Sequence, residues 1–202
     1  MMRMPAPHTS PHEVSARERI LATAHDLFYR DGIRATGVDR LIAESGVAKL
    51  TFYRHFASKD ALVREFLDFR HRRWMAWFID ALGRHGAAAA APGNTRVLLL
   101  ADALQEWVTQ PDFRGCAFIN SVVEVAQALP DAADIARAHK AEMTQVIAEL
   151  LPDSATRELL ADAAALAFDG AIVRAQMAAD AAERDAAVGT LRTVLGALVA
   201  RR

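Results

Sequence analysis

The stretch GVAKLTFYRHFASKD, residues 46–60, arranges polar side chains around a few apolar anchors. At 100° per residue, a helix here carries Phe52 and Phe56 on one side and Leu50 and Arg54 nearly opposite. A helix of two turns is unstable alone, so neighbouring helices must hold its phenylalanine side. The polar side is then turned outward.

The residues before this stretch predict a second short helix. An apolar stripe runs from Val38 through Leu41 to Ile42, and Gly46 permits a sharp turn after it. Helix, turn and helix in this order indicate a helix-turn-helix motif, whose second helix enters the DNA major groove. Its outward side offers cations and neutral hydrogen-bonding groups, namely Lys49, Arg54, Lys59, Thr51, Tyr53 and His55.

Charge is divided unevenly along the 202 residues. Residues 1–75 carry 13 Lys+Arg and 9 Asp+Glu, a balance of +4, whereas residues 76–202 carry 11 and 16, a balance of −5. A basic amino-terminal part joined to an acidic remainder favours a polyanionic partner for the first part.

The composition favours a helical, cytoplasmic protein. Leu, Ala and Val are abundant, and the one cysteine, Cys116, excludes an intrachain disulfide and suits a reducing compartment. The first residues contain no apolar signal segment, and no run approaches the roughly 20 apolar residues of a membrane span. We therefore expect no membrane partner.

Residues 1–14 contain three prolines and read as a flexible arm. His8 and His12 are separated there by Pro11, which argues against a helical pair of metal ligands, and we expect no metal site.

Capping signals mark the expected helices. Ser15 with Glu18 forms a capping box for the first helix, and Thr36 with Asp39 repeats the pattern for the second. Ser58 is a suitable N-cap for a fourth helix, which should run to about Gly83. Further helical runs follow a break at residues 83–94, around 95–109, 116–128, 131–151, 155–179 and 184–200. The fold class expected is all-α.

The segment ATGVDRLIAESGVAKLTFYRHFASKDAL closely resembles the DNA-binding domain of the tetracycline-repressor (TetR) family of bacterial transcription regulators. The resemblance covers about residues 16–65 and implies a flexible arm at 1–14, a three-helix DNA-binding domain at 15–60, and a helical effector-binding and dimerisation domain at 61–202. It implies that Lys49, Leu50, Thr51 and Arg54 face DNA bases and that Thr36, Tyr53, His55 and Lys59 hold phosphates. Many relatives have glycine where this chain has Leu50, so base preference does not carry over.

Beyond residue 65 the resemblance is weaker, with FRGCAFINSVVEV as supporting evidence. The family architecture implies an internal cavity for a small effector, which we expect to be hydrophobic or aromatic, and no cofactor. The candidates to line it are bulky apolar residues and polar anchors in apolar runs. They are Trp74, Trp77, Phe78, Trp107, Cys116, Asn120, Met143, Phe168, Ile172 and Gln176.

Two carboxy-terminal helices carry apolar stripes rich in small residues, which suit a four-helix interface built from two copies of the chain. The expected interface residues are Leu160, Ala164, Ala171, Ala175, Val188, Leu191, Leu195 and Leu198. The same stripes could instead pack only within one chain.

The function that these patterns favour is a ligand-responsive repressor that binds a palindromic operator as a homodimer. An activator, or a regulator that answers to a protein partner, would have the same sequence features. A helical-bundle enzyme is the remote alternative, since the chain has no HExxH, paired-cysteine, nucleophile-elbow or P-loop motif.

Overall fold

The computed structural model describes residues 15–89 and 95–200, and within these ranges the chain is entirely helical. The expected arm at residues 1–14 lies outside the described residues, as do His8 and His12. The helices are α1 (Ala16–Asp31), α2 (Val38–Ser45), α3 (Lys49–His55), α4 (Lys59–Ala89), α5 (Leu99–Val108), α6 (Ala117–Val125), α7 (Asp131–Ala148), α8 (Arg157–Met177) and α9 (Ala181–Ala200), with a 3-10 turn at Arg96–Leu98.

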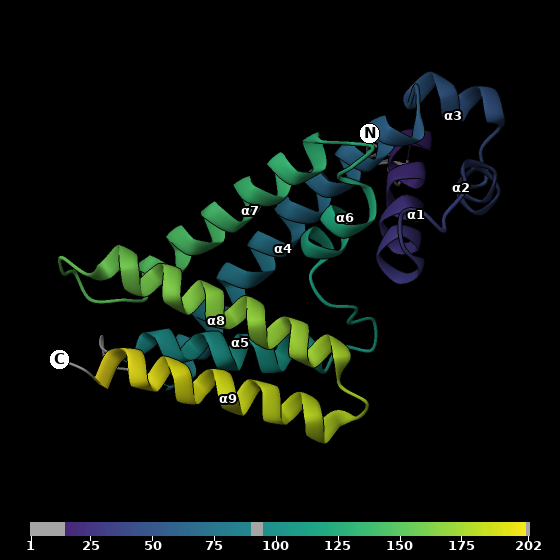
Figure 1. Ribbon diagram of the computed structural model, residues 1–202. Coiled ribbons are helices and arrows are strands. Elements are labelled where there is room, and N and C mark those ends of the chain that lie inside the picture. The colour runs from purple at the N-terminus through teal and green to yellow at the C-terminus, as the bar shows by residue number, and fades with distance from the viewer. Residues whose placement is uncertain (1–14, 90–94, 201–202) are drawn as a thin grey trace, which may run out of the picture.

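The helices divide into two groups that α4 joins (Figure 1). Helices α1, α2 and α3 cluster at one end of the molecule, and α5, α8 and α9 pack together at the other end. Helix α7 packs on α4 and α8, and α6 lies between the two groups. At 1.5 Å per residue, the 31 residues of α4 span about 46 Å, so one rigid element reaches both groups.

The predicted capping box of α1 is confirmed. The Ser15 hydroxyl accepts the Glu18 N–H, and the Glu18 carboxylate accepts the Ser15 N–H at 2.9 Å. Ser58 caps α4 as predicted, because its hydroxyl accepts the Ala61 N–H at 3.1 Å. Gly46 ends α2 at φ 64°, in the left-handed region that favours glycine.

Two predictions about helix ends are wrong. Gly37, not Thr36, is the N-cap of α2, and the Thr36 hydroxyl instead donates to the Gly32 carbonyl at 2.8 Å. Helix α4 continues six residues past Gly83, to Ala89, because the alanines that follow favour helix strongly enough to carry it through a glycine.

The core is continuous between the two groups of helices. Phe28 of α1 meets Phe66 of α4 edge to face, with ring centroids 5.3 Å apart, and Phe78 further along α4 meets Phe168 of α8 at 5.7 Å. None of the described helices is long and apolar enough to cross a membrane.

Candidate nucleic-acid interface

Helix α3 is held by its phenylalanine side, as its sequence predicts. Phe52 and Phe56 are buried, and the Arg17 guanidinium of α1 lies 5.4 Å from the Phe56 ring centroid while pairing with Glu65 of α4 at 2.7 Å. These contacts fix a seven-residue helix that could not form alone.

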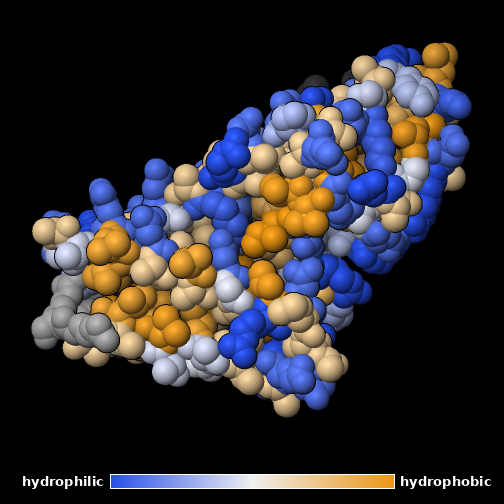
Figure 2. Space-filling view, viewed as in Figure 1, coloured by the Kyte–Doolittle hydropathy of each residue, from blue (hydrophilic) through white to orange (hydrophobic). Residues whose placement is uncertain are grey.

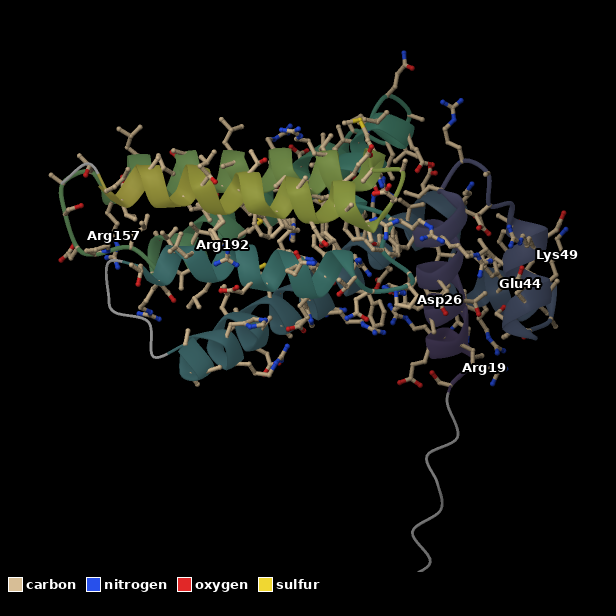
Figure 3. All side chains as sticks on the ribbon, turned by 90° about the horizontal axis from the view of Figure 1, so that it is seen from below. Arg19, Asp26, Glu44, Lys49, Arg157 and Arg192 are labelled. Carbon is tan, nitrogen blue, oxygen red and sulfur yellow. The ribbon has the colours of Figure 1, made fainter. Side chains whose placement is uncertain are left out.

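The opposite side of α3 faces solvent. Leu50 is 82% exposed and Tyr53 is 43% exposed. Lys49, Arg54 and His55 are exposed and Thr51 is partly exposed. Figure 3 shows Lys49 at one extreme end of the molecule, far from Arg157 and Arg192. Cations on this end can therefore meet a polyanion without obstruction from the second group of helices.

The donors of α3 are uncommitted within the described chain. Lys49 lies 4.0 Å from Asp39, and both side chains are largely solvated, so the pair holds the ammonium group only loosely. Arg54 and His55 have no hydrogen-bond or ion-pair partner among the residues that the structure describes.

Two residues expected to hold phosphates lie elsewhere. Thr36 is fully buried and its hydroxyl donates to the Gly32 carbonyl, which is not the exposed position that a phosphate contact needs. Lys59 is partly buried, with its ammonium nitrogen 6.0 Å from the Phe28 ring centroid, and this burial lowers its pKa. The side chain of Lys59 thus turns toward the junction with α1 rather than outward.

The residues expected to line one effector cavity fall into three places. Phe78, Met143 and Phe168 are fully buried packing residues. Asn120 and Gln176 bond to each other at 3.2 Å beside a cavity of about 390 Å³ between α1 and α6. The remaining five, Trp74, Trp77, Trp107, Cys116 and Ile172, belong to an aromatic cluster around α4 and α5.

The aromatic cluster is tightly packed on its inner side. The space next to Cys116 and Ile172 measures about 10 Å³, room for one water at most. On its outer side, Trp74, Trp77 and Trp107 line an open groove of about 320 Å³ together with Tyr29 and Arg70. The space beside Cys116 and Ile172 is therefore too small for an effector, and the larger space beside the tryptophans is the open groove.

Most residues predicted for the dimer interface are buried inside the chain. Ala164, Ala171, Ala175, Val188, Leu191 and Leu195 are at most 5% exposed, and Leu160 and Leu198 are partly buried. Helices α8 and α9 use these stripes to pack on each other and on α5. These six residues are therefore covered within the chain itself, and their place in a dimer interface stays a prediction.

A second stripe on α8, missed by the sequence reasoning, does face outward. Its members recur at alternating intervals of four and three residues, the heptad spacing of helix–helix seams. They are Leu159, Ala163, Leu166, Gly170, Val173 and Met177. Leu159, Leu166 and Met177 are 70 to 75% exposed. Figure 2 shows hydrophobic side chains gathered over α8 and α9 at the end of the molecule away from α3.

Comparison with known proteins agrees with the helix-turn-helix geometry. The family model described as "Bacterial regulatory proteins, tetR family" matches residues 20–66. The HTH-type transcriptional regulator YerO of Bacillus subtilis is 43% identical over 47 residues, which make up 23% of this chain and 16% of that protein. The family-model match runs from α1 through α3 to the start of α4.

Solved structures extend the similarity to the whole chain. A TetR-family regulator from Streptomyces coelicolor, SCO4454, superposes with a TM-score of 0.78 at 27% identity, over 92% of this chain and 88% of that one. A putative TetR-type regulator from Streptomyces avermitilis, sav143, is 32% identical with a TM-score of 0.73, over 91% of this chain and 98% of its own. The chain therefore belongs to the TetR family of bacterial transcriptional regulators.

Proposed function

We propose that the chain is a repressor that binds an inverted-repeat operator as a homodimer and leaves it when a small hydrophobic or aromatic molecule binds. The observation that carries the DNA part is the outward side of α3, where Lys49, Leu50, Thr51 and Arg54 would face base edges. Tyr53 and His55, exposed on the same helix, would contact phosphates.

A DNA complex of a structural neighbour supports this reading. The TetR-family regulator CifR, whose fold matches with a TM-score of 0.71 at 21% identity, has been solved with a 26-base-pair operator duplex. The family is one of DNA-binding regulators and not of enzymes.

The outward stripe of α8 supports the homodimer. A TetR-type dimer must place two α3 helices about one turn of DNA apart, or a multiple of it, which a single chain cannot do. An apolar stripe with heptad spacing on an exposed helix face is suited to seal against the same stripe of a second copy.

The DNA part is tested by selecting bound duplexes from a random pool and measuring their affinity. Arg54→Ala should weaken the selected site by about 1–3 kcal/mol and relax sequence preference, because one bidentate base contact is lost. Lys49→Ala should weaken all sequences and reduce the steepness of the salt dependence if it also touches phosphate.

Arg137→Ala is the matched control, since Arg137 is an exposed arginine of α7, far along the chain from α3. It should bind like the wild type. Unchanged binding by both the Arg54 and Lys49 variants at low and moderate salt would refute α3 as the reading helix.

A further inference from the structure

Arg70, near the middle of α4, is a partly buried arginine without an acidic partner. Its guanidinium lies 3.9 Å from the Tyr29 ring centroid, and one nitrogen is 3.2 Å from His25 Nε2. His25 Nδ1 lies 3.0 Å from the Asp26 carboxylate, so Nδ1–H donates there and Nε2 accepts from Arg70.

Neither the phenol ring nor the neutral imidazole cancels the charge of Arg70. Asp112 lines the same groove and its charge favours the cation, but no acid of the described chain forms an ion pair with Arg70. Burial lowers the pKa of this guanidinium. A partly buried, unpaired cation is costly unless an anion joins it.

Trp74, one turn further along α4, adds an aromatic wall beside Arg70. Its indole Nε1–H is buried away from solvent, so only the ring is available to a molecule in the groove that both residues line. A guanidinium has only donors, and one nitrogen of Arg70 meets His25 Nε2, which leaves other N–H groups for a further acceptor. Residues 70 and 74 are four apart and therefore lie on the same side of the helix.

Both residues line the open groove of about 320 Å³ on the outside of the aromatic cluster. Its walls are aromatic, from Tyr29, Trp77 and Trp107, and Arg73 adds a second cation. The volume is at the lower end of the range for small-molecule sites. The groove thus combines flat apolar walls with a guanidinium whose one acceptor is a neutral imidazole.

We propose that this groove binds a small aromatic carboxylate, with the carboxylate held by the Arg70 guanidinium and the ring lying between Tyr29, Trp77 and Trp107. The inference rests on the proposed function only in identifying this molecule as the effector; the binding site itself is independent of DNA.

Binding here would reach the DNA-binding helices directly. Tyr29 belongs to α1, and its hydroxyl donates to the Gly115 carbonyl at 3.0 Å and accepts the Arg114 N–H at 3.1 Å. A ring inserted beside Tyr29 would contact α1, α4 and α5 together. It would therefore favour one relative placement of α1 and the loop before α6, which is the differential affinity that a switch needs.

The test uses the full chain without DNA and a panel of mono- and bicyclic aromatic carboxylates, including benzoate, salicylate and indole-3-carboxylate. Benzamide and methyl benzoate are the uncharged controls. All three tryptophans of the chain line the groove, so quenching of intrinsic fluorescence reports occupancy directly, and calorimetry gives the dissociation constant. Carboxylates should bind at least tenfold more tightly than the uncharged analogues.

Substitutions of Arg70 test whether its guanidinium holds the carboxylate. Arg70→Gln should weaken carboxylate binding roughly tenfold to hundredfold, and Arg70→Lys should restore part of it, because the charge returns without the planar fork. Arg72→Gln is the control, since Arg72 is exposed on the same helix and pairs with Asp68.

The outcomes separate the site from the function. No binding by any carboxylate at millimolar concentration, equal binding of benzamide, or full affinity in a folded Arg70→Gln protein would overturn the site, whatever the protein does with DNA. Carboxylate binding that depends on Arg70 supports the site even if operator affinity stays unchanged. In that case the proposed effector role fails and the site stands.

Discussion

His139 is a histidine that the fold keeps neutral. It is 2% exposed, its ring stacks on Phe118 with centroids 3.7 Å apart, and its Nδ1 is 3.1 Å from Nδ1 of His71. His71 Nε2 lies 3.1 Å from the Glu142 carboxylate, so a chain of donors runs from His139 through His71 to Glu142. Burial, assisted by the nearby charge of Lys140, lowers the pKa of His139 from 6.5 to about 2.

This lowered pKa makes folding stability depend on pH. Between pH 6.5 and about 2 the unfolded chain binds one proton that the folded chain does not, so stability falls as pH falls through this window. From pH 7 to pH 5 the loss should be about 2 kcal/mol for His139, with His25, whose pKa burial also lowers, adding in the same direction.

Urea denaturation at both pH values measures this loss. His139→Asn keeps a donor near the Nδ1 position but cannot titrate, so the stability difference between pH 7 and pH 5 should shrink by about 2 kcal/mol. His55→Asn, at an exposed position of α3, is the control and should retain the wild-type difference. A variant at position 139 with the wild-type pH dependence would contradict a neutral buried His139.

At the scale of residues, the sequence predicts which side chains are buried better than it predicts what they contact. The spacing of Phe52, Phe56 and Arg54 determines which of them are buried, and the structure agrees. Thr36 and Lys59 have contacts that residue spacing does not determine. A hydroxyl can bond the backbone one turn away, and a long side chain can turn toward a nearby ring, and spacing alone does not reveal which it does.

At the scale of elements, α1 is tied to the second group of helices at two points besides α4. Tyr29 bonds to Arg114 and Gly115 in the loop before α6, and the Glu124 carboxylate of α6 accepts the Arg34 N–H at 3.0 Å, just after α1. Each of these hydrogen bonds has a backbone N–H or carbonyl as one partner, so they fix where the backbone lies rather than altering a charge. The placement of α1 therefore depends on where α6 and its preceding loop lie.

Tyr29→Phe tests the first tie. Loss of the hydroxyl leaves the Gly115 carbonyl and the Arg114 N–H without this partner, and should lower the free energy of unfolding by about 1–3 kcal/mol. Tyr53→Phe is a matched control, because Tyr53 is the other tyrosine and has an exposed side chain on α3. Denaturant unfolding of the two variants compares them, and equal stability would show that the Tyr29 hydroxyl contributes nothing.

At the scale of elements, the sequence does not show which surface an apolar stripe packs against. The stripe of Val188, Leu191 and Leu195 correctly predicts that one face of α9 is buried, but an apolar stripe does not specify what buries it. Helix α8 has two apolar stripes, and the inner one is buried in the core of the chain. The outer one, from Leu159 to Met177, was equally readable from its heptad spacing.

At the scale of the whole molecule, α8 begins at the end away from α3 and runs back to the middle (Figure 1). The proposed dimer joined through α8 would leave both α3 helices free, and its geometry would set their separation. Operator spacing would then depend on an interface away from α3, and α4 spans much of the distance between them.

Leu166→Arg should separate the two subunits without unfolding either one. Leu166 is 75% exposed at the middle of the outer stripe, so arginine is solvated in a monomer but unpaired in an apolar seam between two copies. Sedimentation should show a dimer for the wild type and a monomer for the variant at micromolar concentration, with unchanged helical content. Affinity for a full inverted repeat should fall far more than affinity for a half-site.

Ile79→Arg, at a 52% exposed position of α4, is the control and should stay dimeric. Leu195→Arg should instead unfold the chain, because Leu195 is fully buried within it. A Leu166→Arg protein that remains dimeric would exclude α8 as the seam, and a monomeric wild type would exclude the dimer.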